Sequence, residues 1–297
     1  VSDGVRHVSY AYQNLKIQKK EPYQIATSDY SPHIYISTFA SQEAFARAYE
    51  ERIKDKFAVT PEIQKQADDI TKGLEKKVAA DKTLDLKKEQ ARAIYNWVAR
   101  NIRYVAIYLG DGGIVPHDAS SVLQNRYGDC KDHNALINSG NAYAIPKYPV
   151  IGPFNHVITY IPAWDLYLDS TSEMAPYGVL PIDLLDKPVV LTALAKIGHT
   201  PKPKKEENRT ITGINMQVQK DGRIKGSTHT TYIGSAEITA RYKYEGADTG
   251  YADKFVKSQL AKFRHTGEGK ISTSYVYDLN KPFVTETEFM LDAIANV

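Results

Sequence analysis

The stretch "RYGDCKDH", residues 126–133, contains the only cysteine in a chain of 297 residues. A cysteine used as a small apolar filler is normally buried among apolar neighbours, whereas Cys130 stands between Gly-Asp and Lys-Asp-His. Gly128 and Asp129 interrupt the preceding segment, and "CKDHNAL" is typical of the first turns of a new helix. Because the dipole of a helix N-terminus stabilises a thiolate, this pattern indicates a reactive cysteine.

A histidine and a carboxylate that suit this thiol occur further along the chain. "NHVITYIP" and "DLYLDST" are predicted to be two strands joined by a tight turn at Ala163–Trp164. His156 begins the first strand and Asp169 ends the second. Antiparallel pairing brings the start of one strand beside the end of the other, so both side chains are expected at one sheet edge. There the histidine can exchange a proton with a thiol while the carboxylate orients the imidazole.

The residues before Cys130 are predicted to be mainly helical, after an opening segment of strands. "VRHVSYAYQNLKI" and "HIYISTF" at 33–39 alternate apolar and polar side chains, as half-buried strands do. Capping residues followed by apolar residues at helical spacing predict helices in four segments. These segments are residues 41–57, 60–78, 86–104 and 119–126.

The residues after the His156 and Asp169 strands are predicted to form a second strand-rich region. Its entry, "KPKKEENRT", has the composition of a linker. A hairpin is expected over residues 211–233, turning at Lys220–Gly222, because the turn carries Asp-Gly. A helix near residues 251–264 and a last strand, "ISTSYVYDL" at 271–279, are expected to follow.

Composition excludes several classes of protein. The formal net charge of +3 is too small for a nucleic-acid surface. No apolar run approaches the roughly 20 residues of a membrane-spanning helix. A single cysteine cannot form an internal disulfide, so it does not indicate a redox compartment. The chain opens at Val1 in what resembles the middle of a strand, and we expect any targeting segment to lie upstream.

Four motifs together resemble the bacterial transglutaminase-like superfamily: "YNWVARNIRYV", "PHDASSVLQNRYGDCKD", "FNHVITYIP" and "LYLDST". The resemblance covers about residues 60–195. It implies an α+β fold with a papain-like core, in which the helix that bears the cysteine packs on an antiparallel sheet between β-rich flanking regions. It places the nucleophile on Cys130, the general base on His156 and the orienting acid on Asp169.

The resemblance also implies a domain organisation and a location. Residues 1–57 would be the C-terminal part of an N-terminal β-rich domain, 58–200 the catalytic core and 201–297 a C-terminal β-rich domain. A β-domain of this kind often precedes the module in exported bacterial proteins, so a periplasmic or exported location is expected.

One departure from the family pattern concerns the stretch after the cysteine. In the family, the helix that follows the nucleophile runs several turns and a strand follows it. Here about 15–25 residues of ordinary helix and strand length are missing between Cys130 and the histidine strand. Two explanations stand: a true deletion, which would weaken the enzyme reading, or an omitted segment near Leu136–Ile137, which we favour.

Other side chains are candidates for the cleft. A hydrolase of this kind needs an oxyanion donor besides the backbone N–H of the nucleophile, and Gln124, Tyr104 and Trp97 are possible donors, although the helical stripe favours a core role for Trp97. His117 would line or buttress the cleft. Trp164 in the hairpin turn is a further cleft candidate and is expected to be exposed, either to help bind a partner or by chance. His133 is interpreted as structural, and with Cys130 alone it makes too weak a metal pattern.

The sequence therefore predicts acyl transfer on a peptide or carboxamide bond of a peptide or protein substrate, through a thioester and without a cofactor or metal. Hydrolysis is favoured over transamidation because no amine site is visible, and the oligomeric state is left open. The alternative from another class is a non-catalytic binding module that serves assembly or export of a surface polymer. A structural scaffold with an incidental thiol is a third reading, which requires His156 and Asp169 to lie far from Cys130.

Overall fold

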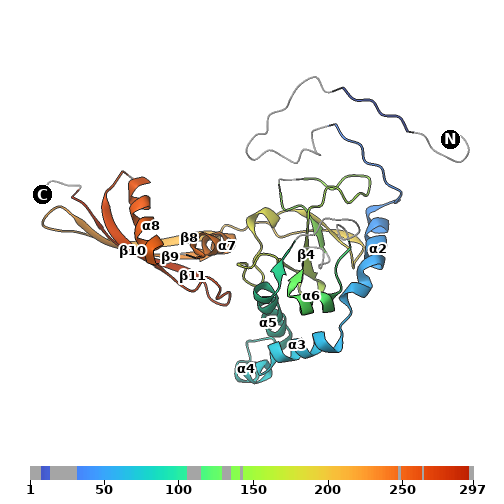
Figure 1. The fold of residues 1–297 in the computed structure, drawn as a ribbon, viewed down its shortest axis with the longest axis horizontal. Coiled ribbons are helices and arrows are strands. Elements are labelled where there is room, and N and C mark those ends of the chain that lie inside the picture. Colours follow the sequence, from blue (N-terminus) through green and yellow to red (C-terminus); the bar gives the residue numbers. More distant parts are fainter. Residues whose placement is uncertain are drawn as a thin grey trace, which may run out of the picture.

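The computed structural model describes residues 8–13, 32–105, 115–128, 135–140, 143–246, 249–262 and 264–293. These residues form two regions that lie beside each other (Figure 1). One combines helices α2 to α6 with a five-stranded sheet of order β5-β4-β3-β6-β7, and the other combines helices α7 and α8 with a four-stranded sheet of order β10-β11-β9-β8. The described chain is thus a mixed fold of helices and antiparallel sheets.

The five-stranded sheet is antiparallel throughout, and a strand of only three residues, β3, lies at its centre. Its strands are β3 (Ala135–Ile137), β4 (His156–Ile161), β5 (Leu166–Leu168), β6 (Pro188–Leu191) and β7 (Lys196–His199). The 3-10 turn η4 (Pro162–Trp164) joins β4 to β5, which confirms the predicted hairpin. Another 3-10 turn, η5 (Ile182–Leu184), precedes β6.

The helices of this region precede the sheet in the chain. They are α2 (Gln42–Ile53), η1 (Lys54–Phe57), α3 (Pro61–Thr71), α4 (Leu74–Ala80), α5 (Leu86–Asn101) and α6 (Ala119–Asn125). Two-residue strands β1 (Arg103–Tyr104) and β2 (Tyr127–Gly128) pair in parallel and tie the end of α5 to the end of α6. Ser41 and Thr60 cap α2 and α3 as their sequences predict, by accepting backbone N–H bonds.

The core of this region lies on both faces of β3. Leu136 packs on one face with Phe45 and Ile53 of α2. Ala135 and Ile137 lie on the other face, in a cluster with Leu184. Because successive strand residues point to opposite faces, a strand covered on both sides reads as an unbroken apolar run.

That double burial corrects the predicted helix over "CKDHNAL". Its last residues, Ala135 and Leu136, belong to β3, and the strand runs through Leu136–Ile137 without interruption. A short apolar run fits a buried strand as well as a buried helix, so periodicity does not separate the two. The proposed helix start at Cys130 lies outside the described residues.

Three other sequence predictions change in detail. The helix expected over 60–78 breaks into α3 and α4 at Gly73, whose φ of 85° ends regular helix geometry. The helix expected to reach Tyr104 ends at Asn101, since the next residues pair as β1. The strand expected at 33–39 is absent, because residues 32–40 form neither helix nor strand. The described residues 8–13 form neither helix nor strand either. The predicted domain boundary between residues 57 and 58 stays a prediction.

The C-terminal region contains a predicted hairpin and elements that the sequence did not reveal. It consists of β8 (Arg209–Val218), β9 (Ile224–Ile233), α7 (Ser235–Tyr244), α8 (Thr249–Lys262), β10 (Gly267–Thr273) and β11 (Phe283–Leu291). The β8–β9 hairpin and α8 confirm the expectations for this region. The strand expected over 271–279 is wrong in its bounds, because β10 ends at Thr273. The sequence did not predict helix α7. Its buried face includes the charged residues Glu237 and Arg241, which interrupt the apolar spacing expected of a helix.

The two regions are in contact through the loop that follows β5. Met174 and Ala175 of this loop are fully buried in a cluster with Ile238 of α7 and Phe283 of β11. Asn96 of α5 donates a hydrogen bond to Asn280 at 2.8 Å. The C-terminal region therefore packs directly against the loop that begins at Asp169.

Candidate functional site

His156 and Asp169 are in contact, as the hairpin geometry predicts. His156 Nε2 lies 3.2 Å from Asp169 Oδ2. His156 begins β4 and pairs with Ile137 of the central strand, while Asp169 follows β5, one residue beyond the pairing of Leu168 with Thr159. Both side chains are largely shielded from solvent, with 11% of the histidine and 5% of the aspartate exposed. The sheet therefore delivers an imidazole and a carboxylate to one place from two neighbouring strands.

The two oxygens of Asp169 have different partners. Oδ1 accepts hydrogen bonds from the backbone N–H of Thr171 at 3.1 Å and from its hydroxyl at 2.6 Å. Oδ2 faces the histidine. One carboxylate therefore both caps the following turn and contacts His156. The turn fixes the rotamer of Asp169 and so fixes the direction in which Oδ2 points.

Tyr95 of α5 holds the backbone on which Asp169 sits. Its hydroxyl lies 3.0 Å from the carbonyl oxygen of Asp169 and 3.0 Å from that of Ala175. Burial, followed by the nearby charge of Asp169, raises the pKa of Tyr95 well above its usual range. The phenol therefore stays protonated and donates to this loop at any physiological pH.

Cys130 itself belongs to residues 129–134, which lie outside the described residues, as do Asp132 and His133. The last described residue before it is Gly128, which is buried and ends β2. Gly128 and Thr171 line the same cavity. The last described residue before Cys130 thus lines the same cavity as Thr171, the hydrogen-bond partner of Asp169.

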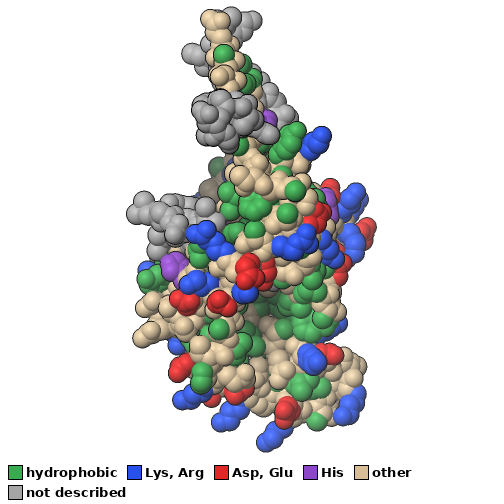
Figure 2. All heavy atoms as spheres, turned by 90° about the vertical axis from the view of Figure 1, so that its right-hand side faces the viewer, with side chains coloured by type: hydrophobic (Ala, Val, Ile, Leu, Met, Phe, Trp, Pro, Cys, Tyr) green, Lys and Arg blue, Asp and Glu red, His purple; other side chains and the backbone are tan. Residues whose placement is uncertain are grey.

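This cavity has a volume of about 290 Å³ and lies among α3, α5 and α6. Most of its wall is apolar. Figure 2 shows hydrophobic side chains gathered around a recess in the lower half of the face it presents. The apolar residues that line the cavity are Phe57, Ile63, Ala67, Ile70, Ile94, Trp97, Val98, Ile102, Ala119, Val122 and Leu123.

The structure separates the other cleft candidates. Tyr104, His117 and Trp97 line the cavity, and the guanidinium of Arg126 lies over the Trp97 ring, 4.7 Å from its centroid. Gln124 is exposed on α6 and does not appear in the cavity wall.

Trp164 lies at the far end of the same hairpin. It belongs to η4, after the last residue of β4, whereas His156 begins that strand. Five residues of strand separate the two ends, which corresponds to about 16 Å. Trp164 is therefore not brought to the His156–Asp169 pair, and it is half-buried, which corrects the expectation that it is exposed.

The sequence indicated the role of Thr171 but not that of Tyr95. An Asp followed two residues later by Thr is a turn signal, so the hydrogen bonds of Thr171 to Asp169 were predictable from the local sequence. Tyr95 lies 74 positions from Asp169 in the chain. The spacing of apolar residues in its helix does not predict that contact.

Two further properties of the described part of the chain concern metal binding and membrane insertion. It contains no cluster of three or more His, Cys, Asp or Glu side chains arranged as metal ligands. None of its helices combines the length and apolarity needed to cross a bilayer.

Comparison with known proteins gives one similarity, to a family. No curated protein and no solved structure matches the chain significantly. The family match begins at Lys72, includes α5, α6 and Cys130, and ends before His156. Over residues 72–139, this chain matches the model of the transglutaminase-like superfamily.

Proposed function

We propose that this protein is a cysteine-dependent acyl-transfer enzyme with Cys130 as nucleophile, His156 as general base and Asp169 as the orienting acid. The observation that carries the proposal is the 3.2 Å contact between His156 Nε2 and Asp169 Oδ2. It is supported by the cavity that Gly128 and Thr171 share and by the family match, which includes the cysteine. A histidine held by a carboxylate near a cysteine is the arrangement that activates a thiol.

The tautomer of His156 sets the direction of proton transfer. Because Nε2 faces Asp169, Nδ1 is the nitrogen that exchanges a proton with the thiol. The thiolate attacks the carbonyl carbon of a peptide or carboxamide bond, and the imidazolium then protonates the departing amine as the C–N bond breaks. A thioester remains on the cysteine. His156 next takes a proton from water, the hydroxide releases the acid, and the thiol is restored.

We propose hydrolysis as the net reaction, with a peptide or protein as substrate and an exported or periplasmic location. Water is the default acceptor of a thioester. An amine that reached the thioester first would give transamidation with the same three residues. The choice therefore depends on the acceptor.

A second candidate function rests on the short stretch after Cys130. Strand β3 begins at Ala135, five positions after the cysteine, whereas a helix needs 3.6 residues for each turn. The several-turn helix that the family places there does not fit between these residues. This spacing favours a non-catalytic module that binds a surface polymer or its assembly machinery.

The decisive experiment is the pH dependence of Cys130 alkylation by iodoacetamide. The wild type is compared with His156→Ala and with a matched control, His229→Ala, whose histidine is exposed on the C-terminal sheet. We expect rapid labelling well below pH 7 in the wild type and the control, and its loss in His156→Ala. A single titration near the ordinary thiol value of about 8.5, unchanged by His156→Ala, would refute the catalytic proposal and favour the binding module.

A further inference from the structure

The cavity beside the His156–Asp169 pair contains more apolar surface than proton transfer requires. Ile63, Ala67 and Ile70 recur at helical spacing along α3 and line it, opposite Ile94 and Val98 of α5. All five side chains are only half-buried, and α3 buries none of its residues fully. Apolar side chains of the two helices thus line an open volume beside the contact between α3 and α5, which leaves surface that an apolar guest would cover.

The position of the cavity links it to the proposed chemistry. Ser170 and Thr171 form part of its wall, and both Thr171 donors bind Asp169. Gly128, two positions before Cys130, lies on the same wall. A group that entered the cavity would therefore contact Thr171, which holds Asp169, and Gly128, which precedes Cys130 by two positions in the chain.

The size of the cavity limits what can occupy it. Its volume of about 290 Å³ is at the lower end of small-molecule sites, which begin near 300 Å³. It is roughly twice the engineered apolar cavity of about 150 Å³ that holds a benzene ring. One aromatic or branched aliphatic side chain fits this volume.

The polar groups of the wall suit a peptide more than a pure hydrocarbon. Gln66, Arg103 and His117 line the cavity together with the apolar residues. An apolar interior with a few polar groups is the usual composition of a site that orients a ligand. A side chain would occupy the apolar part while the main chain of the substrate meets polar groups.

We propose that this cavity is a specificity pocket for one large apolar side chain of the peptide substrate. The proposal rests on the proposed function, because it takes the residue beside the bond that is cleaved as the occupant. It adds the chemical class of substrate, a peptide with an aromatic or branched aliphatic residue next to the reacting carbonyl. Each buried methylene group would raise affinity about fourfold.

The test measures binding without catalysis, in the Cys130→Ala variant of the full chain. Calorimetric titration with N-acetyl-L-phenylalaninamide is compared with N-acetyl-L-alaninamide. We expect the first to bind at least about tenfold more tightly than the second. Ala67→Phe fills the cavity from α3 and should abolish this preference. The control Ala80→Phe makes the same change at an exposed position at the end of α4 and should leave the preference intact.

A second variant guards against misfolding of Ala67→Phe. Ile94→Ala enlarges the cavity and should shift the preference toward N-acetyl-L-tryptophanamide. No saturable binding of any of the three amides, with Ala67→Phe raising the Tm, would overturn the proposal and identify the cavity as incomplete packing between helices. Equal binding in Ala67→Phe and wild-type backgrounds would also overturn it. The alkylation experiment is independent of these titrations, so failure of the pocket and failure of the triad are distinguishable.

Discussion

The central strand of the first sheet and the edge strand of the second show two opposite ways to build a strand. β3 has three residues, and all are buried, with Leu136 only 2% exposed. β8 has ten residues, and all are exposed, with Met216 at 64%. β3 is covered on both faces, whereas β8 depends on its pairing with β9 along one side. Burial fixes the first strand, and backbone pairing fixes the second.

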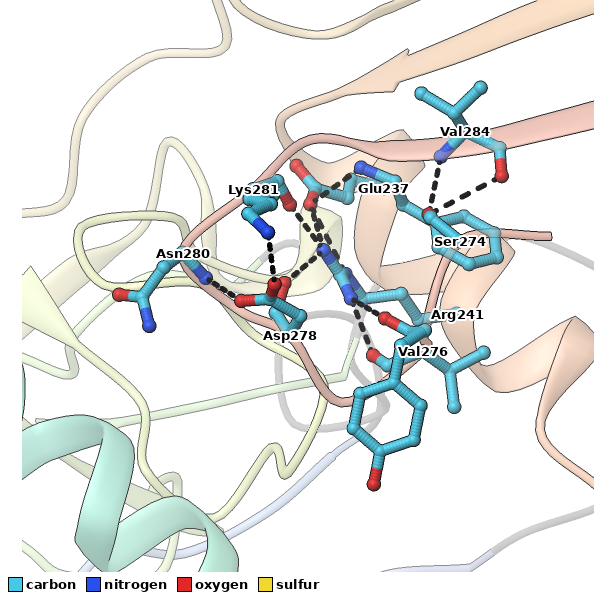
Figure 3. Close-up of polar contacts among 10 residues, drawn as sticks. Glu237, Arg241, Ser274, Val276, Asp278, Asn280, Lys281 and Val284 are labelled. Atoms are coloured by element: carbon cyan, nitrogen blue, oxygen red, sulfur yellow. Dashed lines mark hydrogen bonds and ion pairs between the residues drawn. The ribbon is translucent and has the colours of Figure 1, made fainter.

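The C-terminal region, to which the exposed strand β8 belongs, contains a buried ion pair. Figure 3 shows Arg241 of α7 directed at Glu237 and at the loop before β11. Arg241 is fully buried, and its Nη2 lies 2.6 Å from Glu237 Oε1. The same guanidinium donates to the carbonyl oxygens of Val276, Asp278 and Lys281. The C-terminal region thus adds a buried charged group with satisfied hydrogen bonds to its apolar cluster, whereas apolar contacts alone cover β3.

The largest effect is expected from breaking that ion pair. Arg241→Ala leaves Glu237 buried without its cation, and we expect a loss of about 3–5 kcal/mol in the free energy of unfolding. Burial already raises the pKa of Glu237, so the loss should shrink at low pH, where the carboxyl takes up a proton. Urea unfolding at several pH values measures this. Arg209→Ala on exposed β8 is the control, and an equal loss there would contradict the prediction.

A slightly smaller loss is expected from the centre of the first sheet. Leu136→Ala removes a side chain that packs with Phe45 and Ile53, and should cost about 2–5 kcal/mol. The matched change Ile214→Ala affects a residue of β8 that is 56% exposed and should cost about 0.5 kcal/mol or less. Chemical denaturation of both variants measures the two losses in the free energy of unfolding. Similar losses would show that exposure in β8 does not reflect its energetic role.

A moderate effect is expected at the contact between the regions. Tyr95→Phe removes the hydroxyl that binds the carbonyl oxygens of Asp169 and Ala175, and should cost about 1–3 kcal/mol. Because Asp169 becomes less fixed, Cys130 labelling below pH 7 should slow as well. Tyr275→Phe, at a tyrosine that is 67% exposed, should change neither quantity. Unfolding and labelling measured together test both parts.

The raised pKa of Tyr95 leads to a prediction for the free energy of unfolding at alkaline pH. Burial raises the pKa of Tyr95 in the folded state above the unfolded value near 10. Its contribution to stability is therefore complete below pH 10 and is lost as the pH rises toward the folded value. Urea unfolding between pH 8 and 11 should show a decline that is smaller in Tyr95→Phe. A decline of equal size would assign it to other groups.

The smallest effect is expected on the pKa of a single tyrosine. Tyr167 and Tyr277 have similar pKa values, which are raised by different causes. Burial raises the pKa of Tyr167 in the first sheet to about 12, whereas a hydrogen bond to Glu245 is the main cause of a pKa of about 12 for Tyr277. Glu245→Gln should return Tyr277 toward 10 and leave Tyr167 unchanged. Tyrosine ring NMR signals followed through a pH titration check this. Movement of both values would contradict the assignment.

The sequence by itself determined the local geometry of the candidate site. Alternating residues in β4 and β5 and a turn of a few residues are enough to place His156 beside Asp169, because antiparallel pairing has few registers. Caps at Ser41 and Thr60 are local hydrogen bonds and were readable for the same reason. Each of these features is decided within a short segment, so no distant partner is needed to predict it.

Only the tertiary structure decided the features that depend on distant partners. Ala135–Ile137 became a strand because α2 and the η5 segment cover both of its faces, which a run of three apolar residues does not reveal. Tyr95 reached the Asp169 loop from another element, and the apolar stripe of α3 came to line a cavity beside its contact with α5. Periodicity shows which face of an element is apolar. What covers that face is decided by packing among segments far apart in the chain.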